Sequence, residues 1–187
     1  YTLTAGEEQI DLSNKNLGSA DVALLTAWLQ RPEVTAAIAS LDCSQNDAIT
    51  GKRSRDSDNL GPWIYGENLD GWNKMCSALA GSSITSLYFS GCQLNSESLT
   101  PLTEAIKVMA TIARLTLSGN PISGSTKRFG SWDKYDLDLS GLISLCDALL
   151  RLKNPIELDV SDCGLSVNGV NEIAKAMSAG ATVNSLT

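Results

Sequence analysis

The fold is decided by residues 86–115, which read SLYFSGCQLNSESLTPLTEAIKVMATIARL. The stretch begins with alternating apolar residues, Leu87 and Phe89, and passes through a Ser-Gly-Cys turn. Apolar residues at helical spacing follow from Leu99 onward, and the opening phrase returns at Leu115. A strand, a turn and a helix of this size cannot bury their apolar side alone. We therefore expect the unit to stack on copies of itself.

The same phrase recurs along the chain. Its copies read IDLSNKNL, LDCSQNDAI, LYFSGCQL, LTLSGNPI and LDVSDCGL. Their first apolar residues are Ile10, Leu41, Leu87, Leu115 and Leu158, and a truncated sixth copy starts at Leu186. Five residues after each full copy begins, one column holds Lys15, Asn46, Cys92, Asn120 and Cys163. This pattern predicts one short parallel strand per copy, with neighbouring strands in register.

The recurring LxLxx(N/C)xL phrase resembles the leucine-rich repeat family. The 28-residue spacing from Leu87 to Leu115, and from Leu158 to Leu186, is similar to the ribonuclease-inhibitor-like subclass. The resemblance implies an α/β fold, a curved solenoid with a parallel sheet inside and helices outside, forming one domain over residues 1–187. Because the last copy is incomplete, we expect a piece of a longer chain.

Helix boundaries follow from capping residues and from proline. Ser19 predicts the N-cap of a helix that runs to Gln30 and is ended by Pro32. A second helix is predicted near residues 70–80. The strand-like phrase at residues 137–140 aligns with the entry to that second helix, so we interpret it as another helix entry with Ser140 as N-cap.

The second and fourth copies are longer than the others, at 46 and 43 residues. The excess falls in residues 47–68 and 121–138, in each case just after the turn that follows the strand. Because neighbouring repeats are about one strand spacing apart, the two insertions are expected about 10 Å from each other on one rim.

Both insertions combine basic residues with aromatic ones, and such residues are enriched in binding hot spots. The candidate rim residues are Lys52, Arg53, Arg55, Trp63, Tyr65, Lys127, Arg128, Phe129, Trp132 and Tyr135. In the alternative interpretation, Trp63 and Trp132 fold down over the edge of the solenoid and the basic side chains are solvated.

A second candidate surface is the concave face of the sheet, where the side chains between the core leucines point. Its candidate residues are Asp11, Asp42, Tyr88, Arg114, Thr116, Glu157 and Asp159. The face is polar and acidic, and Tyr88 is its one large anchor. The family resemblance implies that protein partners bind on this concavity and its rims.

The five cysteines all occupy repeat positions, which favours buried thiols that act as small hydrophobic residues. Disulfides or a metal site are the alternatives. Reduced, buried cysteines are typical of an intracellular compartment, so we expect a cytoplasmic protein.

Composition argues against several function classes. The net charge of −7 disfavours nucleic-acid and anionic-membrane partners. The absence of histidine excludes Ser-His-Asp and Cys-His arrangements and histidine metal ligands. Neither a GxxxxGK[ST] nor a GxGxxG phrase occurs. We predict no catalytic residue, no metal, no cofactor and no enzymatic activity.

These features predict a non-catalytic scaffold for protein–protein interaction. The phrase LSNKNLGSADVALLTAWL resembles repeats of actin-regulatory scaffolds such as the CARMIL and tropomodulin families. Two alternatives remain open, a GTPase activator similar to the Ran-activating family and the sensor segment of a larger receptor. We expect a monomer, with self-association through the C-terminal strand edge as an alternative.

Overall fold

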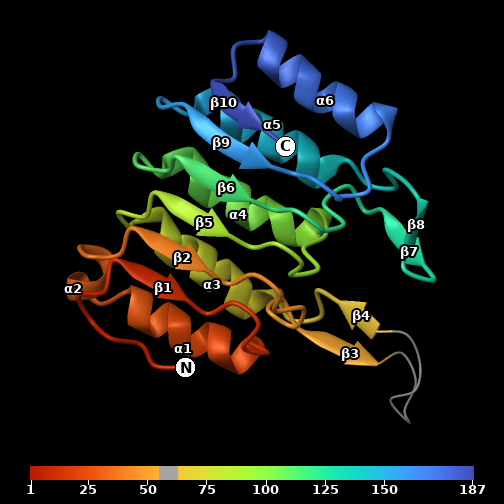
Figure 1. Ribbon diagram of the computed structural model, residues 1–187. Coiled ribbons are helices and arrows are strands. Elements are labelled where there is room, and N and C mark those ends of the chain that lie inside the picture. The colour runs from red at the N-terminus through yellow and green to blue at the C-terminus, as the bar shows by residue number, and fades with distance from the viewer. Residues whose placement is uncertain (55–62) are drawn as a thin grey trace.

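Six parallel strands form a sheet in the order β1-β2-β5-β6-β9-β10 (Figure 1). The computed structural model describes residues 1–54 and 63–187. The strands are β1 (Gln9–Asp11), β2 (Ser40–Asp42), β5 (Ser86–Tyr88), β6 (Arg114–Thr116), β9 (Ile156–Asp159) and β10 (Val183–Leu186). The first apolar residues of the sequence phrases are register partners across the whole sheet, namely Ile10, Leu41, Leu87, Leu115, Leu158 and Leu186. The predicted parallel sheet with neighbouring strands in register is confirmed.

Helices cover one face of this sheet. They are α1 (Ser19–Leu29), α2 (Pro32–Thr35), α3 (Leu69–Ala80), α4 (Ser96–Val108), α5 (Ser140–Arg151) and α6 (Val167–Ser178). In Figure 1, α3, α4 and α5 lie behind the strands, and the long helices follow one another in chain order. Among the described residues, no helix combines the length and the apolar character needed to cross a bilayer.

The predicted helix boundaries need small corrections. Gly18 and Leu139 occupy the N-cap positions of α1 and α5, so Ser19 and Ser140 are the first helical residues. The Asp21 carboxylate accepts the Gly18 N–H at 3.0 Å and satisfies the backbone there. The α1 helix ends at Leu29, and Pro32 opens the short α2 helix, which suits a residue without an N–H.

The core lies between the sheet and the helices. Trp72 of α3 is fully buried and meets Phe89 edge-on, with ring centroids 5.3 Å apart. Its indole N–H donates to the Ser98 carbonyl of α4 at 2.7 Å, so one side chain joins two helices to the sheet. Trp28 of α1 is also buried in this core.

A column of buried side chains joins each repeat to the one before it. The Asn120 amide donates to the carbonyls of Leu117 and Phe89, each at 2.7 Å, and its oxygen accepts the Leu94 N–H at 3.0 Å. Asn46 makes the matching contacts with Leu12, Lys15, Leu17, Cys43 and Ser44. Each asparagine thus satisfies backbone groups of two consecutive repeats, groups that would otherwise be buried without partners.

Cysteines replace asparagine in two places of this column. The Cys92 thiol donates to the Cys43 carbonyl at 3.1 Å, and the Cys163 thiol to the Leu117 carbonyl at 3.2 Å. Burial raises the pKa of each of these two thiols to about 12, so both stay protonated and able to donate. All five cysteines lie in the described part of the chain, are buried and are free of disulfides, as the packing interpretation predicts.

Each insertion contains a two-stranded antiparallel hairpin. The first pairs β3 (Lys52–Ser54) with β4 (Trp63–Tyr65), and the second pairs β7 (Thr126–Arg128) with β8 (Ser131–Lys134). Both leave the body on the side where the parallel strands end (Figure 1). The sequence predicts two insertions on one rim but not that each forms a hairpin.

We expect Asn120→Ala to lower the free energy of unfolding by about 3 kcal/mol, because it leaves several buried backbone groups of two repeats unpaired. Urea denaturation measures this change. Asn154→Ala is the control, since exposed Asn154 makes a single contact, to the Ala110 carbonyl, and its loss should cost well under half as much. Equal losses for the two variants would contradict a structural role for the column.

Candidate functional site

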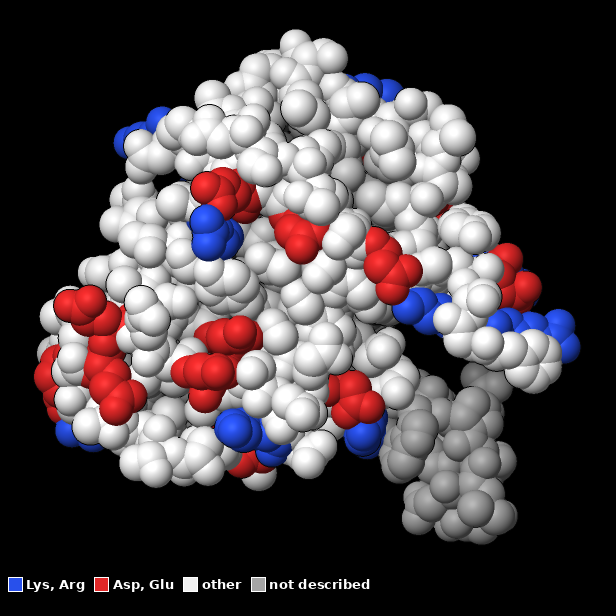
Figure 2. All heavy atoms as spheres, in the orientation of Figure 1, with Lys and Arg blue, Asp and Glu red and all other residues white. Residues whose placement is uncertain are grey.

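The predicted concave-face residues lie together on the open face of the sheet. Asp11, Asp42, Tyr88, Thr116 and Asp159 are register partners on successive strands, and Arg114 and Glu157 pair beside them. We call these seven residues the strand face. Acidic side chains are scattered over this side of the molecule in Figure 2.

The three aspartates of the strand face also build the turns that follow their strands. Asp11 accepts the Ser13 N–H at 2.9 Å, and Asp42 accepts the Ser44 N–H at 2.8 Å. Asp159 repeats the arrangement at 2.9 Å with Ser161. Hydrogen bonds from the side chain and backbone of Ser13 lower the pKa of Asp11. These carboxylates therefore stabilise the turns after their strands, a role that their position on the strand face does not reveal.

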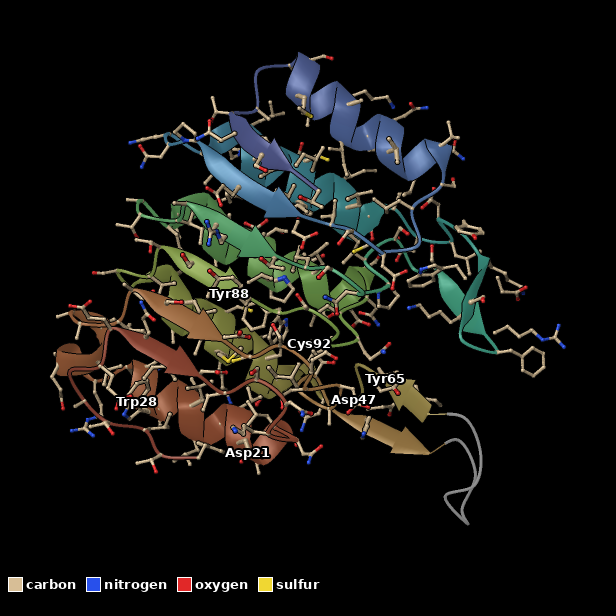
Figure 3. All side chains as sticks on the ribbon, viewed as in Figure 1. Asp21, Trp28, Asp47, Tyr65, Tyr88 and Cys92 are labelled. Atoms are coloured by element: carbon tan, nitrogen blue, oxygen red, sulfur yellow. The ribbon has the colours of Figure 1, made fainter. Side chains whose placement is uncertain are left out.

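Tyr88 and its basic neighbour form a small cluster at the middle of the strand face (Figure 3). The Arg114 guanidinium donates to the Tyr88 hydroxyl at 3.2 Å and to Glu157 at 2.7 Å. About half of the Arg114 and Glu157 side chains is exposed, so solvent screens this ion pair and it contributes little to stability.

The first hairpin places Tyr65 beside the body of the protein. Tyr65 is half-buried, and its pKa is raised first by burial and then by the nearby Asp47 carboxylate. Asp47 pairs with Lys52 at 2.7 Å. Arg53 and Trp63 contribute their backbones to the hairpin, whereas Arg55 lies outside the described residues.

The second hairpin ends in an exposed aromatic tip. Phe129 and Gly130 have φ angles of +50° and +82°, as expected for a tight two-residue hairpin turn. A positive φ at a bulky residue is unusual, and Phe129 is 95% exposed. The Arg128 guanidinium lies 5.2 Å from the centre of its ring. The tip therefore presents a ring and a cation to solvent.

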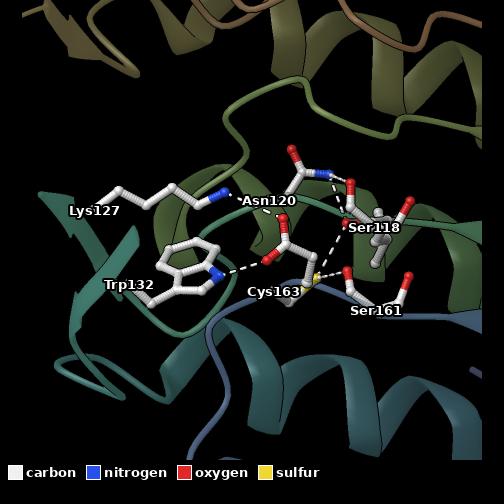
Figure 4. Close-up of polar contacts among 8 residues, drawn as sticks. Ser118, Asn120, Lys127, Trp132, Ser161 and Cys163 are labelled. Atoms are coloured by element: carbon white, nitrogen blue, oxygen red, sulfur yellow. Dashed lines mark hydrogen bonds and ion pairs between the residues drawn. The ribbon is translucent and has the colours of Figure 1, made fainter. Parts of the chain in front are cut away.

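Trp132 holds this hairpin against the following repeat (Figure 4). Its indole N–H donates to Asp162 at 2.7 Å, and the Lys127 ammonium lies 4.3 Å from the ring centre and 3.2 Å from the same carboxylate. The indole covers Gly164, where an added Cβ would come within 2.6 Å of the ring. Trp132 thus folds down over the edge of the body, as the alternative interpretation states for this residue, whereas the side chain of Trp63 lies outside the described part of the structure.

A further contact from the second insertion reaches α6. Asp136 accepts the Ser166 hydroxyl at 2.5 Å and the Gly169 N–H at 2.8 Å, and so occupies the N-terminal end of that helix. Burial raises the Asp136 pKa, but the hydrogen bonds from Ser166 and Gly169 outweigh it and the net shift is downward. The insertion is thereby fixed at two points of the last full repeat.

Between the two hairpins lies a groove of about 600 Å³, which we call the rim groove. One wall carries Tyr65 of β4, and the opposite wall carries Thr126, Lys127 and Trp132 of the second hairpin. The floor comes from the turns after β5 and β6, which supply Gln93, Asn95, Gly119 and Pro121. Glu97 in the first turn of α4 and Asp138, just before α5, complete it.

The structure brings some predicted rim residues together and separates others. Tyr65, Lys127 and Trp132 share the rim groove. Arg128 and Phe129 lie at the tip of the second hairpin, and Tyr135 lines a different, largely apolar cavity of about 450 Å³ beside α6 and β10. Sequence reasoning missed Glu97 and Asp138 in the lining of the rim groove. It also missed the contacts of Asp136 and Asp162, because their partners lie about 30 residues away in a neighbouring repeat.

Solved structures supply the comparison with known proteins. The chain is similar to the leiomodin-1 actin-binding site 2, with a TM-score of 0.57 and 16% identity over 89% of this chain and 76% of that one. It is also similar to the tropomodulin C-terminal domain of Caenorhabditis elegans, with a TM-score of 0.56 and 11% identity over 94% and 84% of the two chains. No family model and no curated protein matches the sequence. At these identities the likeness establishes a leucine-rich-repeat-like α/β fold.

We expect Gly164→Ala to displace the Trp132 indole, because the new methyl group would overlap the ring. The variant should shift tryptophan emission to longer wavelength and destabilise the protein by about 1–2 kcal/mol. Gly180→Ala is the matched control, since Gly180 also has a positive φ but no atom lies within 4 Å of its added Cβ. Equal emission spectra for the two variants would contradict the packing of Trp132 on Gly164.

Asp136→Asn should destabilise the protein by about 1 kcal/mol at pH 7, the usual effect of losing a helix cap. Because the folded pKa of Asp136 is below its unfolded value, the stabilisation is complete above the ordinary aspartate pKa of about 3.9 and disappears as pH falls through the folded pKa. Thermal unfolding of both proteins between pH 7 and pH 2 measures this. A difference that stayed constant down to the lowest pH would contradict the role of the carboxylate.

Proposed function

We propose that this chain is a non-catalytic scaffold that holds a protein partner at the rim formed by its two hairpins. The observation that carries the proposal is the rim groove, in which Tyr65, Lys127 and Trp132 converge from insertions far apart in the sequence. Two of these residues, Tyr65 and Trp132, are of the types most enriched in binding hot spots.

The exposed tip of the second hairpin supports the same proposal. Phe129 is almost fully exposed, although the turn would favour asparagine or glycine at its position. Trp132 and Asp136 fix the hairpin to the last full repeat, so the tip is presented on a firm base. A fixed aromatic ring contributes contact area at low cost in conformational entropy.

The strand face is the second part of the proposed surface. Its aspartates are engaged in turns, and Arg114 is paired with Glu157, so fewer of its polar groups are free to meet a partner than its composition indicates. We therefore assign the rim the larger share of the binding energy.

Actin is the first partner to test, because the similar leiomodin-1 domain is described as an actin-binding site. We also assign the repeats to the ribonuclease-inhibitor-like subclass, from their 28-residue spacing. In this proposal the chain forms one monomeric domain that acts in the cytoplasm. The GTPase-activating and receptor-sensor alternatives stay predictions, and stimulated GTP hydrolysis would identify the first of them.

The test compares Phe129→Asn with the wild type. Asparagine suits the positive φ of the turn, so the fold should persist while the aromatic contact is lost. We expect at least tenfold weaker binding to purified actin in microscale thermophoresis, or to a partner identified by affinity capture and then purified. Val108→Ser is the control, since exposed Val108 ends α4 outside both proposed surfaces.

A second pair of variants separates the two parts of the surface. If Phe129→Asn binds like the wild type and the double variant Tyr88→Ala, Arg114→Ala does not, the strand face carries the binding and the rim proposal is wrong. If all variants and the wild type fail to retain any protein, the scaffold proposal itself is wrong.

A further inference from the structure

The rim groove is bordered by two strands that each lack a partner on one side. Among the described residues, β4 pairs only with β3, and β7 only with β8. Figure 1 shows β4 and β7 as the inner strands of the two hairpins, with β3 and β8 outside them. Residues of both inner strands line the groove. The groove therefore separates two open strand edges.

In the first hairpin, the unpaired backbone groups belong to Tyr65. Hydrogen-bonded and non-hydrogen-bonded pairs alternate along an antiparallel ladder. The Gly66 N–H donates to the Gly51 carbonyl at 3.0 Å, so the next pair, Lys52 and Tyr65, is of the non-hydrogen-bonded kind. The N–H and C=O of Tyr65 consequently point away from β3, toward the open edge of β4.

In the second hairpin, the same reasoning selects Lys127. Arg128 and Ser131 flank the two-residue turn and form its hydrogen-bonded pair. The next pair, Lys127 and Trp132, is therefore non-hydrogen-bonded, and the N–H and C=O of Lys127 point toward the open edge of β7. Tyr65 and Lys127 both line the rim groove.

The spacing of the parallel strands sets how far apart the two hairpins begin. The hairpins leave the body after β2 and β6, and only β5 lies between those two strands in the sheet. Two steps of about 4.8 Å place the bases of the two hairpins about 10 Å apart. A strand added between two others lies about 4.8 Å from each, so the distance between the hairpin bases is on the scale that one added strand occupies. The repeat of β5, which has no insertion, supplies Gln93 and Asn95 to the floor.

The groove lining also indicates which side chains would suit such a strand. Glu97 and Asp138 are exposed acidic residues of the lining, although one Asp138 carboxylate oxygen accepts the Ser140 N–H at 3.0 Å. The one basic residue of the lining, Lys127, is already paired with Asp162. Trp132 contributes an aromatic wall. Because strand side chains alternate, basic and apolar residues two positions apart would both face the floor.

We propose that the rim groove binds an extended peptide segment of a protein partner as an added strand between β4 and β7. The backbone of the segment pairs with the open edges at Tyr65 and Lys127, and its basic and apolar side chains meet Glu97, Asp138 and Trp132. This mode of recognition, strand addition, takes affinity from the main chain and specificity from alternate side chains. The inference rests on the proposed scaffold function and states the form in which the partner is held.

The test uses a phage-displayed library of random 12-residue peptides selected on the whole chain. Enriched peptides should carry basic and apolar residues two positions apart, and fluorescence polarisation measures their affinity. Lys127→Ala and Lys127→Pro both remove the lysine side chain, but only proline removes the outward N–H, and proline is tolerated where that N–H does not enter the ladder. We expect Lys127→Pro to bind about tenfold more weakly than Lys127→Ala, the effect of one hydrogen bond.

Tryptophan emission is the control, because the two Lys127 variants should give matching spectra if the hairpin is intact. Equal affinities of the two variants, or a library that yields no enriched peptide, would overturn the added strand. If this happens while Phe129→Asn still releases its protein partner, the scaffold function stands and only its mode is wrong.

Discussion

The structure depends on one buried hydrogen-bonding column, in which a side chain of each repeat completes the backbone of the repeat before it. Asn46 and Asn120 do this with an amide, which both donates and accepts, and Cys92 and Cys163 do it with a thiol. The turns after the strands cannot be buried without such partners. Neighbouring repeats are consequently stabilised as pairs, which couples their folding along the sheet.

The column also explains where extra chain can be accommodated. Both insertions begin after the residue that fills it, so the buried contacts of Asn46 and Asn120 persist while the chain extends outward into a hairpin. The second hairpin is then tied back by Trp132 on Gly164 and by Asp136 at the start of α6. A regular body thus carries two irregular projections without losing its own hydrogen bonds.

The sequence predicts the parallel sheet and its register well, because the same core positions recur in each copy of the phrase, from Ile10 to Leu158. It predicts less of the rim, since a hairpin depends on the paired positive φ angles of Phe129 and Gly130, and such angles are seldom adopted by phenylalanine. The contact of Trp132 with Asp162 crosses 30 residues and has no repeat to reveal it. The Asp-x-Ser pattern at Asp11, by contrast, is visible in the sequence and indicates a turn.

The buried thiols of the column can be used to measure local opening of the repeats. A reagent that alkylates cysteine attacks the thiolate, and burial keeps Cys92 and Cys163 protonated and shielded. Labelling at Cys92 requires separation of the second and third repeats, whereas labelling at Cys163 requires separation of the fourth and fifth. The relative rates of modification at the two cysteines therefore show which end of the repeat array opens first.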